Sequence, residues 1–256
     1  MDLGLTGRTY VITGGSTGLG FATARALVDE GANVVVVARR ADAVEQAVVE
    51  LGDRAAGLAA DLADDRTPLA AIDLARERFG RVDGGLVSVG GPPAGRVTST
   101  TDEQWRGAFE SVFLGSVRMS RELCAAMLAD GTADGGAIAL VLSVSAVEVF
   151  SGLSTSNGLR PGLAMLVTDL ADEVGPAGIR VLGLLPGRIS TDRMVSLDAA
   201  TGDAAAAEQR ASAGIPLRRY GRPGEFGQVA AFALSPAASY LTGSLIRVDG
   251  GSTRHP

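Results

Sequence analysis

The chain has only one cysteine, Cys124, and one histidine, His255, among its 256 residues. A single cysteine excludes an intramolecular disulfide and fits a reducing compartment. The two residues are also too few to assemble a Cys/His metal cluster. We therefore expect a cytoplasmic protein without a bound metal ion.

Long apolar runs, a basic leader and a net positive charge are missing as well. The chain starts Met-Asp-Leu-Gly-Leu, and its longest apolar runs, such as residues 137–142, are far shorter than the roughly 20 residues of a membrane-spanning helix. The formal net charge of −6 argues against a nucleic-acid partner, which would select a basic face. We therefore expect neither a membrane nor a nucleic acid as partner.

Strand-like and helical patterns alternate along the chain, which is 46% hydrophobic and can bury a substantial core. The strand-like segments are residues 8–13, 33–38, 55–60, 84–89, 137–143, 180–185 and 245–248, and the first helical ones are residues 18–30 and 41–51. This order predicts a single α/β domain over residues 1–256, with a doubly wound parallel sheet covered by helices on both faces. The ligand crevice of such a sheet lies beyond the carboxyl ends of its strands. Residues 198–213 are expected to be a helical excursion, within a mobile substrate lid around residues 192–215.

The first strand ends in a glycine-rich stretch, where residues 10–20 read Tyr-Val-Ile-Thr-Gly-Gly-Ser-Thr-Gly-Leu-Gly. Gly14, Gly18 and Gly20 lack a Cβ atom, so the turn can adopt positive φ and approach a ligand closely. The N-terminus of the following helix adds exposed N–H groups and the positive end of its dipole. The stretch therefore favours a phosphate cradle, and a plain strand-to-helix corner is the alternative.

Four further motifs follow the glycine turn in a fixed order: Ala-Asp-Leu at 60–62, Pro-Gly-Arg-Ile-Ser-Thr at 186–191, Gly-Arg-Pro-Gly-Glu at 221–225 and Ala-Ser-Tyr-Leu-Thr-Gly at 238–243. With these motifs the chain resembles the short-chain dehydrogenase/reductase family from residue 5 to about residue 252. The similarity is strongest to the 3-oxoacyl-carrier-protein reductase-like members. It implies a Rossmann-type fold, an oxidoreductase with NAD(P) in the crevice, and a homotetramer in contact through helices at residues 102–129 and 156–174.

The resemblance also implies which residues hold the cofactor. The family's glycine turn, adenine position and nicotinamide loop correspond here to Gly14, Ser16, Thr17, Gly18, Leu19, Gly20, Asp61, Leu62, Ser88, Gly90, Pro186, Gly187, Ile189 and Thr191. Asp61 matches the adenine position, with the capping of a helix as an equally good interpretation. Ile189 and Thr191 match the loop that holds the nicotinamide carboxamide.

The second strand ends Ala-Arg-Arg at residues 38–40. An acidic residue near this strand end binds the 2′-hydroxyl of NAD, whereas arginine accommodates the 2′-phosphate of NADP. Arg39 and Arg40 can bind that phosphate through paired, charge-assisted hydrogen bonds. We therefore expect NADP(H) to be preferred over NAD(H), with two solvated loop arginines as the alternative.

The catalytic residues depart from the family pattern. The family uses an Asn, a Ser, a Tyr thirteen positions after the Ser, and a Lys four after the Tyr. Ser143 fits the serine, but Ser156 and Arg160 stand at the tyrosine and lysine positions, and Val112 stands at the asparagine position. The serine hydroxyl is an alkyl alcohol and therefore a poor general acid, and an arginine side chain stays protonated. We therefore expect the catalytic set of Ser143, Ser156 and Arg160 to bind the cofactor better than it transfers protons.

Other charged residues could contact a substrate. Glu148 belongs to the loop that forms one wall of the family's pocket, Arg96 and Arg188 belong to the loops opposite, and His255 could come only from a neighbouring subunit's tail. Each is more often a solvated charge than a catalytic group. Two functions therefore stay open: an NADP(H)-dependent oxidoreductase for a carbonyl or alcohol substrate with an atypical active site, or a cofactor-binding sensor or partner subunit with little or no activity.

Overall fold

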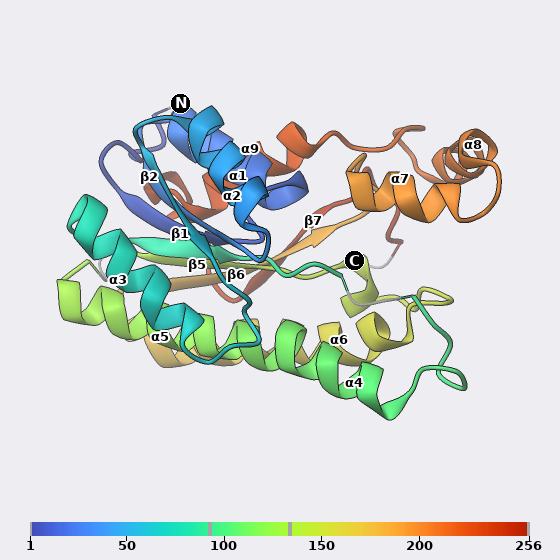
Figure 1. Cartoon of the computed structure of the whole chain (residues 1–256), viewed down its shortest axis with the longest axis horizontal. Coiled ribbons are helices and arrows are strands. Elements are labelled where there is room, and N and C mark those ends of the chain that lie inside the picture. The colour runs from blue at the N-terminus through green and yellow to red at the C-terminus, as the bar shows by residue number, and fades with distance from the viewer. Residues whose placement is uncertain (1, 92–93, 133–134, 255–256) are drawn as a thin grey trace.

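A computed structural model of the chain describes residues 2–91, 94–132 and 135–254. They form a central parallel sheet between two layers of helices (Figure 1). The strands are β1 (Thr9–Thr13), β2 (Asn33–Ala38), β3 (Ala55–Ala59), β4 (Gly84–Val87), β5 (Ala137–Val141), β6 (Arg180–Pro186) and β7 (Ser244–Val248). Their spatial order is β3-β2-β1-β4-β5-β6-β7, with every pair parallel. This arrangement confirms the predicted doubly wound α/β fold.

Helices cover both faces of the sheet. One layer contains α1 (Gly18–Asp29), α2 (Ala41–Leu51) and α9 (Pro223–Leu234), and the other contains α3 (Thr67–Phe79), α4 (Asp102–Ala108), η1 (Phe109–Leu114), α5 (Gly115–Asp130) and α6 (Ser154–Val174) (Figure 1). Short helical turns η2 (Val144–Ala146), η3 (Gly175–Ala177) and η4 (Pro236–Ala238) lie in connections, and α7 (Asp192–Ala199) and α8 (Ala204–Gly214) project beyond the sheet.

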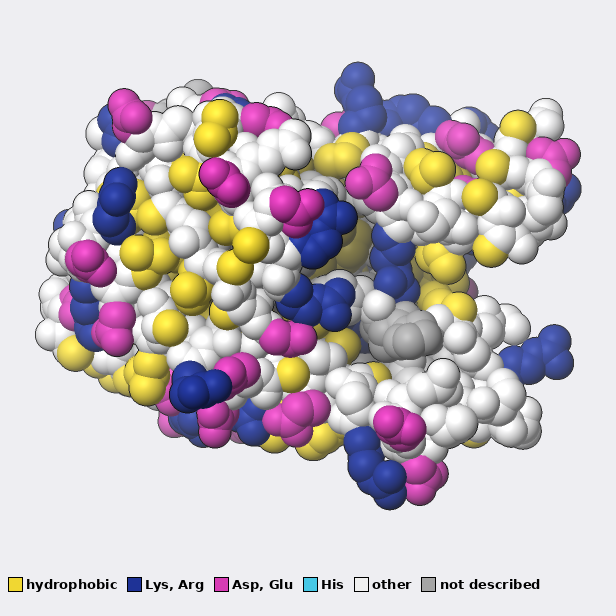
Figure 2. All heavy atoms as spheres, in the orientation of Figure 1, with side chains coloured by type: hydrophobic (Ala, Val, Ile, Leu, Met, Phe, Trp, Pro, Cys, Tyr) yellow, Lys and Arg dark blue, Asp and Glu magenta, His cyan; other side chains and the backbone are white. Residues whose placement is uncertain are grey.

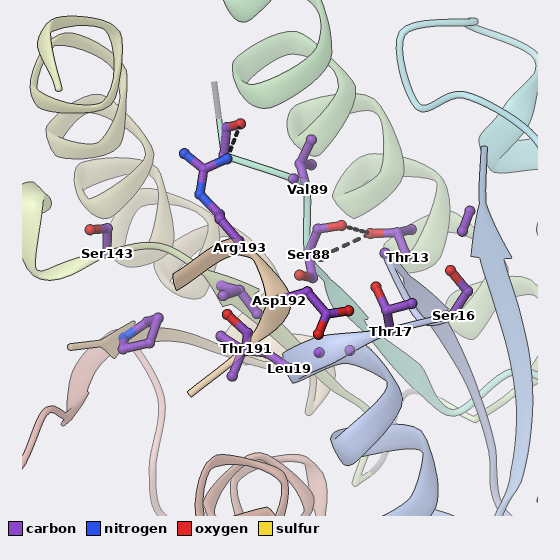
Figure 3. Close-up of a pocket in the computed structure, with 18 of the residues that line it drawn as sticks. Thr13, Ser16, Thr17, Leu19, Ser88, Val89, Ser143, Thr191, Asp192 and Arg193 are labelled. Atoms are coloured by element: carbon purple, nitrogen blue, oxygen red, sulfur yellow. Dashed lines mark hydrogen bonds between the residues drawn. The ribbon is translucent and has the colours of Figure 1, made fainter. Parts of the chain in front are cut away.

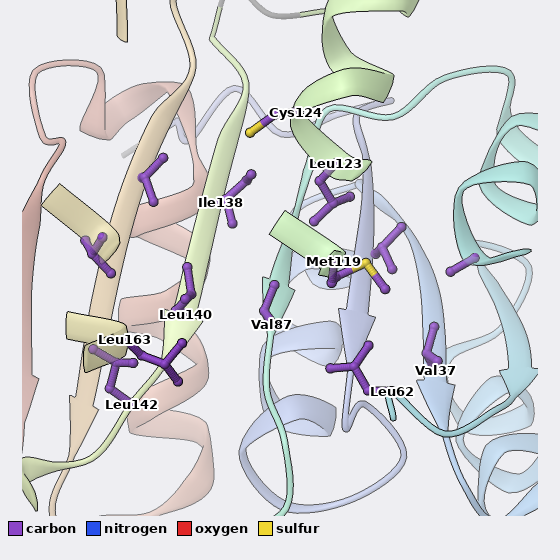
Figure 4. Packing of buried hydrophobic residues seen from close by; sticks show 14 of the residues in the cluster. Val37, Leu62, Val87, Met119, Leu123, Cys124, Ile138, Leu140, Leu142 and Leu163 are labelled. Carbon is purple, nitrogen blue, oxygen red and sulfur yellow. The ribbon is translucent and has the colours of Figure 1, made fainter. Parts of the chain in front are cut away.

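The four valines of β2 contribute side chains to the hydrophobic clusters on both faces of the sheet. Val35 and Val37 pack in the cluster beneath α3, α5 and α6, shown in Figure 4, whereas Val34 and Val36 pack in the cluster beneath α1 and α9. All four side chains are buried. A continuous apolar run is what a parallel strand needs when helices cover both faces.

The order of the strands reverses between β1 and β4. β1 pairs with β2 on one side and with β4 on the other, so the connections leaving their carboxyl ends run to opposite sides of the sheet. A crevice forms at such a switch point. The loops after these strands therefore frame the site.

Several element boundaries differ from the predicted ones. β4 ends at Val87 rather than residue 89, since the Ser88 N–H donates to the Thr13 hydroxyl instead of extending the ladder. The predicted helix at residues 102–129 is α4, a π-helical segment η1 and α5. The helical excursion predicted at residues 198–213 is made of the end of α7 and of α8, two helices separated near Gly202, which has φ +89°.

The described residues contain no helix that is both long and apolar enough to cross a membrane. The longest described helix, α6, has 21 residues and buries only one face against the core.

Candidate active site

A crevice of about 540 Å³ lies at the carboxyl ends of the strands β1 to β6. Figure 2 shows the hollow on one face of the molecule, with arginine side chains around it. All residues that the sequence assigned to cofactor binding and to catalysis line this crevice. The fold thus brings them together, while their individual roles stay predictions.

The glycine turn forms the floor of the crevice at β1. Gly14 and Gly18 have φ of +58° and +56°, which side chains rarely tolerate. A Cβ on Gly20 would overlap the Gly14 carbonyl. None of the described side chains caps the N-terminus of α1, and its first turn has no acidic residue. The N–H groups of that turn are therefore available to a phosphate.

The ends of β1 and β4 are joined by a reciprocal pair of hydrogen bonds. The Thr13 hydroxyl donates to the Ser88 carbonyl at 2.8 Å and accepts from the Ser88 N–H at 2.8 Å (Figure 3). A Cβ on Gly14 would lie 2.8 Å from the same carbonyl oxygen. These contacts fix the floor of the crevice at the switch point.

Arg39 and Arg40 line the rim of the crevice beyond β2, and both are exposed. Arg40 forms an ion pair with Asp42 at 3.3 Å, whereas Arg39 has no carboxylate partner among the described residues. Asp61 lines the neighbouring wall, and one of its carboxylate oxygens accepts from the Ala63 N–H at 3.0 Å. That bond closes a local turn and leaves the second oxygen for a ligand.

Three serine hydroxyls lie near the carboxyl end of β5. The Ser143 hydroxyl accepts from the Ser145 N–H at 3.1 Å, and the hydroxyls of Ser145 and Ser156 are 2.8 Å apart. Ser145 and Ser156 are buried. Ser145 was not predicted from the sequence, where its only signal is its place two residues after Ser143. The Ser143 proton is left to donate to a substrate oxygen, while the Ser156 hydroxyl shares a hydrogen bond with Ser145.

Arg160 is a buried cation in the wall of the crevice. Its side chain lies on α6, is 5% exposed and donates from one terminal nitrogen to the Val141 carbonyl. Its Nε has no hydrogen-bond partner among the described residues. Burial, followed by the charge of Arg193, lowers the pKa of Arg160 to about 10. Arg160 is therefore protonated at neutral pH and cannot act as a base there.

Arg193, in the first turn of α7, is a crevice residue that the sequence did not reveal. Its guanidinium donates to the Gly91 carbonyl at 2.6 Å and fills the space where a Cβ on Gly91 would lie. The neighbouring Asp192 also lines the crevice. α7 thus reaches across the opening to the loop after β4 (Figure 3).

The other charged candidates lie away from the described lining of the crevice. Glu148 and Arg96 do not line it, and Arg96 is exposed. Arg188 instead contacts the Asp198 carboxylate at 3.2 Å and the Tyr220 hydroxyl at 3.0 Å, and Tyr220 donates to Asp198 at 3.0 Å. This cluster fastens α7 to the loop before α9. His255 lies outside the described residues.

The chain contains three tyrosines and no lysine. Tyr10 is buried and donates to the Leu234 carbonyl, Tyr220 belongs to the cluster with Arg188, and Tyr240 is fully exposed. None of the three lines the described part of the crevice. No other phenol or ammonium side chain is present to act there.

Comparisons with known proteins place this site in a family context. The profile described as Enoyl-(Acyl carrier protein) reductase matches residues 14–253. The chain is 32% identical to cis-4-hydroxycyclohexanecarboxylate dehydrogenase from Sinomonas cyclohexanicum, over 96% of each chain. It is also 32% identical to 2,5-dichloro-2,5-cyclohexadiene-1,4-diol dehydrogenase from Sphingobium indicum, over 97% of this chain and 98% of that one.

A solved structure shares the fold over the whole length of the chain. The L-sorbose reductase from Gluconobacter frateurii, solved with NADPH and L-sorbose, superposes with a TM-score of 0.94 at 31% identity and full coverage of both chains. The matched profile covers almost the whole chain, including the glycine turn from Gly14 and the residues after it that line the crevice. The chain belongs to the short-chain dehydrogenase/reductase family.

Proposed function

We propose that the protein is an NADP(H)-dependent oxidoreductase that interconverts a secondary alcohol and a ketone. One observation carries the proposal: a single crevice runs from the uncapped N-terminus of α1, past Arg39 and Arg40, to the hydroxyls of Ser143 and Ser156. Its relatives include dehydrogenases of ring alcohols and a reductase bound to NADPH and a sugar. The bound nicotinamide would supply or accept the hydride.

The crevice fits a dinucleotide. Glycines with positive φ and free helix N–H groups suit its diphosphate, and Asp61 suits its adenine side. Arg39 supports a preference for NADP(H), because it lacks a described carboxylate partner and can bind the 2′-phosphate with paired hydrogen bonds. Thr191, close to Gly18, would hold the nicotinamide end.

The chain's own residues would act on the substrate oxygen through hydrogen bonds. Ser143 would donate to this oxygen because its own acceptor site is occupied by the Ser145 N–H. Ser156, at the position of the family's tyrosine, would add a second hydroxyl near this oxygen. Arg160, at the position of the family's lysine, would bind ribose hydroxyls of the cofactor and remain protonated. Without a phenol the proton would come from water in the crevice, and loss of a positioned acid typically costs about 10²- to 10⁴-fold in rate.

The second candidate is a cofactor-binding sensor or partner subunit with little or no activity. The mutual hydrogen bond of Ser145 and Ser156 favours it, because it engages the hydroxyl that would otherwise reach a substrate. Titration of NADPH fluorescence, followed by a hydride-transfer assay with ring ketones, quinones and 3-oxoacyl thioesters, separates the two. Absence of NADPH binding would refute both, and binding without transfer would leave the second.

We further propose a cytoplasmic homotetramer in which residues 192–215 act as a substrate lid. α5 and α6 support the assembly because Leu128 and Met165 on them are 54% and 72% exposed. α7 and α8 support the lid because each buries only one residue, Asp198 and Ala207 respectively. A monomer in light scattering at micromolar concentration would contradict the assembly.

A further inference from the structure

The crevice is more positively charged than the protein around it. The charged residues that line its described part are Arg39, Arg40, Arg160, Arg193, Asp61 and Asp192. The whole chain carries a formal net charge of −6, so an excess of arginine here is a local property of the crevice. Such a site attracts anions.

Among the described residues, no acidic side chain neutralises the Arg160 charge. No described carboxylate forms an ion pair with it, its Nε has no described partner, and it is 5% exposed. Burying a cation without an anion is costly, so such groups are usually found beside a counter-ion or a ligand. The ribose hydroxyls proposed above are neutral and would leave this charge in place.

Arg193 brings a second cation to the same space. It lines the same crevice and is the neighbouring charge that acts on Arg160, although Arg193 itself is exposed whereas Arg160 is buried. The Arg193 side chain donates to the Gly91 carbonyl. In Figure 3 the Asp192 carboxylate is instead directed toward Thr17. The acid beside Arg193 in sequence therefore faces the glycine turn rather than Arg160.

Arg160 lies away from the place expected for the cofactor's phosphates. Arg160 contacts the carbonyl of Val141, the last residue of β5, and Arg193 contacts Gly91 in the loop after β4. The glycine turn follows β1, which is two strands from β5. With strands about 4.8 Å apart, Val141 is on the order of 10 Å from the turn.

We propose that the substrate is a ketone or alcohol that also carries a carboxylate, which Arg160 and Arg193 hold while the reacting carbon lies beside Ser143. This inference rests on the proposed oxidoreductase function. Guanidinium groups match a carboxylate with paired, charge-assisted hydrogen bonds that are directional, and burial strengthens them at Arg160. Arg193 lies on the proposed lid, so the substrate's charge would also fasten α7 over the crevice.

Calorimetric titration of the NADPH-loaded protein tests this site. The probes are levulinate and acetoacetate, two oxo acids of different length, and the uncharged methyl ester of each. We expect at least one acid to bind tenfold or more tightly than its ester, which is about 1.4 kcal/mol. Arg193→Gln should abolish that difference and Arg193→Lys should keep part of it. Arg78→Gln removes an equal charge from an exposed position of α3, outside both the described crevice lining and the proposed lid, and should leave the difference unchanged.

The outcomes distinguish this inference from the proposed function. The inference would be overturned if neither acid binds better than its ester, or if Arg193→Gln and Arg78→Gln cause equal losses, even if neutral ketones are reduced. An acid that displaces NADPH would also overturn it, because the arginines would then hold the cofactor's phosphates. Tight, Arg193-dependent binding of an acid without any hydride transfer would support the anion site and refute the oxidoreductase.

Discussion

Replacing Ser156 by tyrosine and Arg160 by lysine restores the phenol and ammonium expected in the family. Ser156 lies in the first turn of α6 and lines the crevice, so a ring at this position would extend into a space of about 540 Å³ rather than into the core. A positioned acid is typically worth about 10²- to 10⁴-fold in rate, so we expect NADPH-dependent ketone reduction to rise by at least about 10²-fold.

The same double variant should be less stable. It loses the 2.8 Å hydrogen bond between Ser145 and Ser156, worth about 1 kcal/mol, and crowds Leu153 in the crevice wall. Overpacking costs about 1–3 kcal/mol, and a chain of this size loses about 2–4 °C in Tm per kcal/mol. We therefore expect a folded protein with a Tm lower by about 4–16 °C.

The control is Ser156→Phe with Arg160→Lys, which adds the same ring without its hydroxyl. Both variants are assayed for NADPH binding, for thermal unfolding and for reduction of neutral ketones. A folded, NADPH-binding tyrosine variant that is no faster than the phenylalanine variant would refute the reasoning. The crevice would then not hold a ketone as a reductase does, and the sensor or partner-subunit function would be preferred.

Three further changes test other parts of the site. Arg39→Ala with Arg40→Ala should remove a preference for NADPH over NADH of at least tenfold, about 1.4 kcal/mol, in cofactor titrations; an unchanged preference would show that neither arginine meets the 2′-phosphate. Gly20→Ala should weaken NADPH binding and lower the Tm because the new Cβ meets the Gly14 carbonyl, whereas Gly107→Ala in α4, where the Cβ meets open space, should raise stability by about 0.5–1 kcal/mol. Tyr220→Phe should cost about 1–3 kcal/mol in chemical denaturation, because the buried Asp198 loses its hydroxyl donor; a change in proteolysis confined to α7 and α8 would show that the cluster fastens the lid.

Local signals predicted most of the fold. The helix at residues 41–51 and the strand at residues 33–38 match α2 and β2 because their apolar periods and flanking residues are local properties. The π-helical turn at η1 could not be predicted, since one wider turn hardly changes the apolar spacing of a long helix. The break between α7 and α8 was hidden by alanines that suit either helix.

Local sequence signals likewise predicted one part of the site and missed another. Glycine turns and strand ends predicted the cofactor crevice, because parallel strands end at one edge of the sheet. Arg193 was missed because its partner, Gly91, is 102 residues away in the sequence. Ser145 was missed because its role depends on the hydrogen bond between its hydroxyl and that of Ser156, which lies on another element. Pairings of this kind depend on tertiary packing and leave no local pattern.

The two walls of the crevice differ in how freely they can change during evolution. Ser156 and Arg160 stand on α6, which buries ten residues in the core, so substitutions there disturb the whole domain. Arg193 stands on α7, which buries only Asp198, and α8 beyond it buries only Ala207. Substitutions on α7 and α8 therefore cost little folding free energy. A lineage built on this domain can alter what it recognises through α7 and α8 while the wall formed by α6 stays as it is.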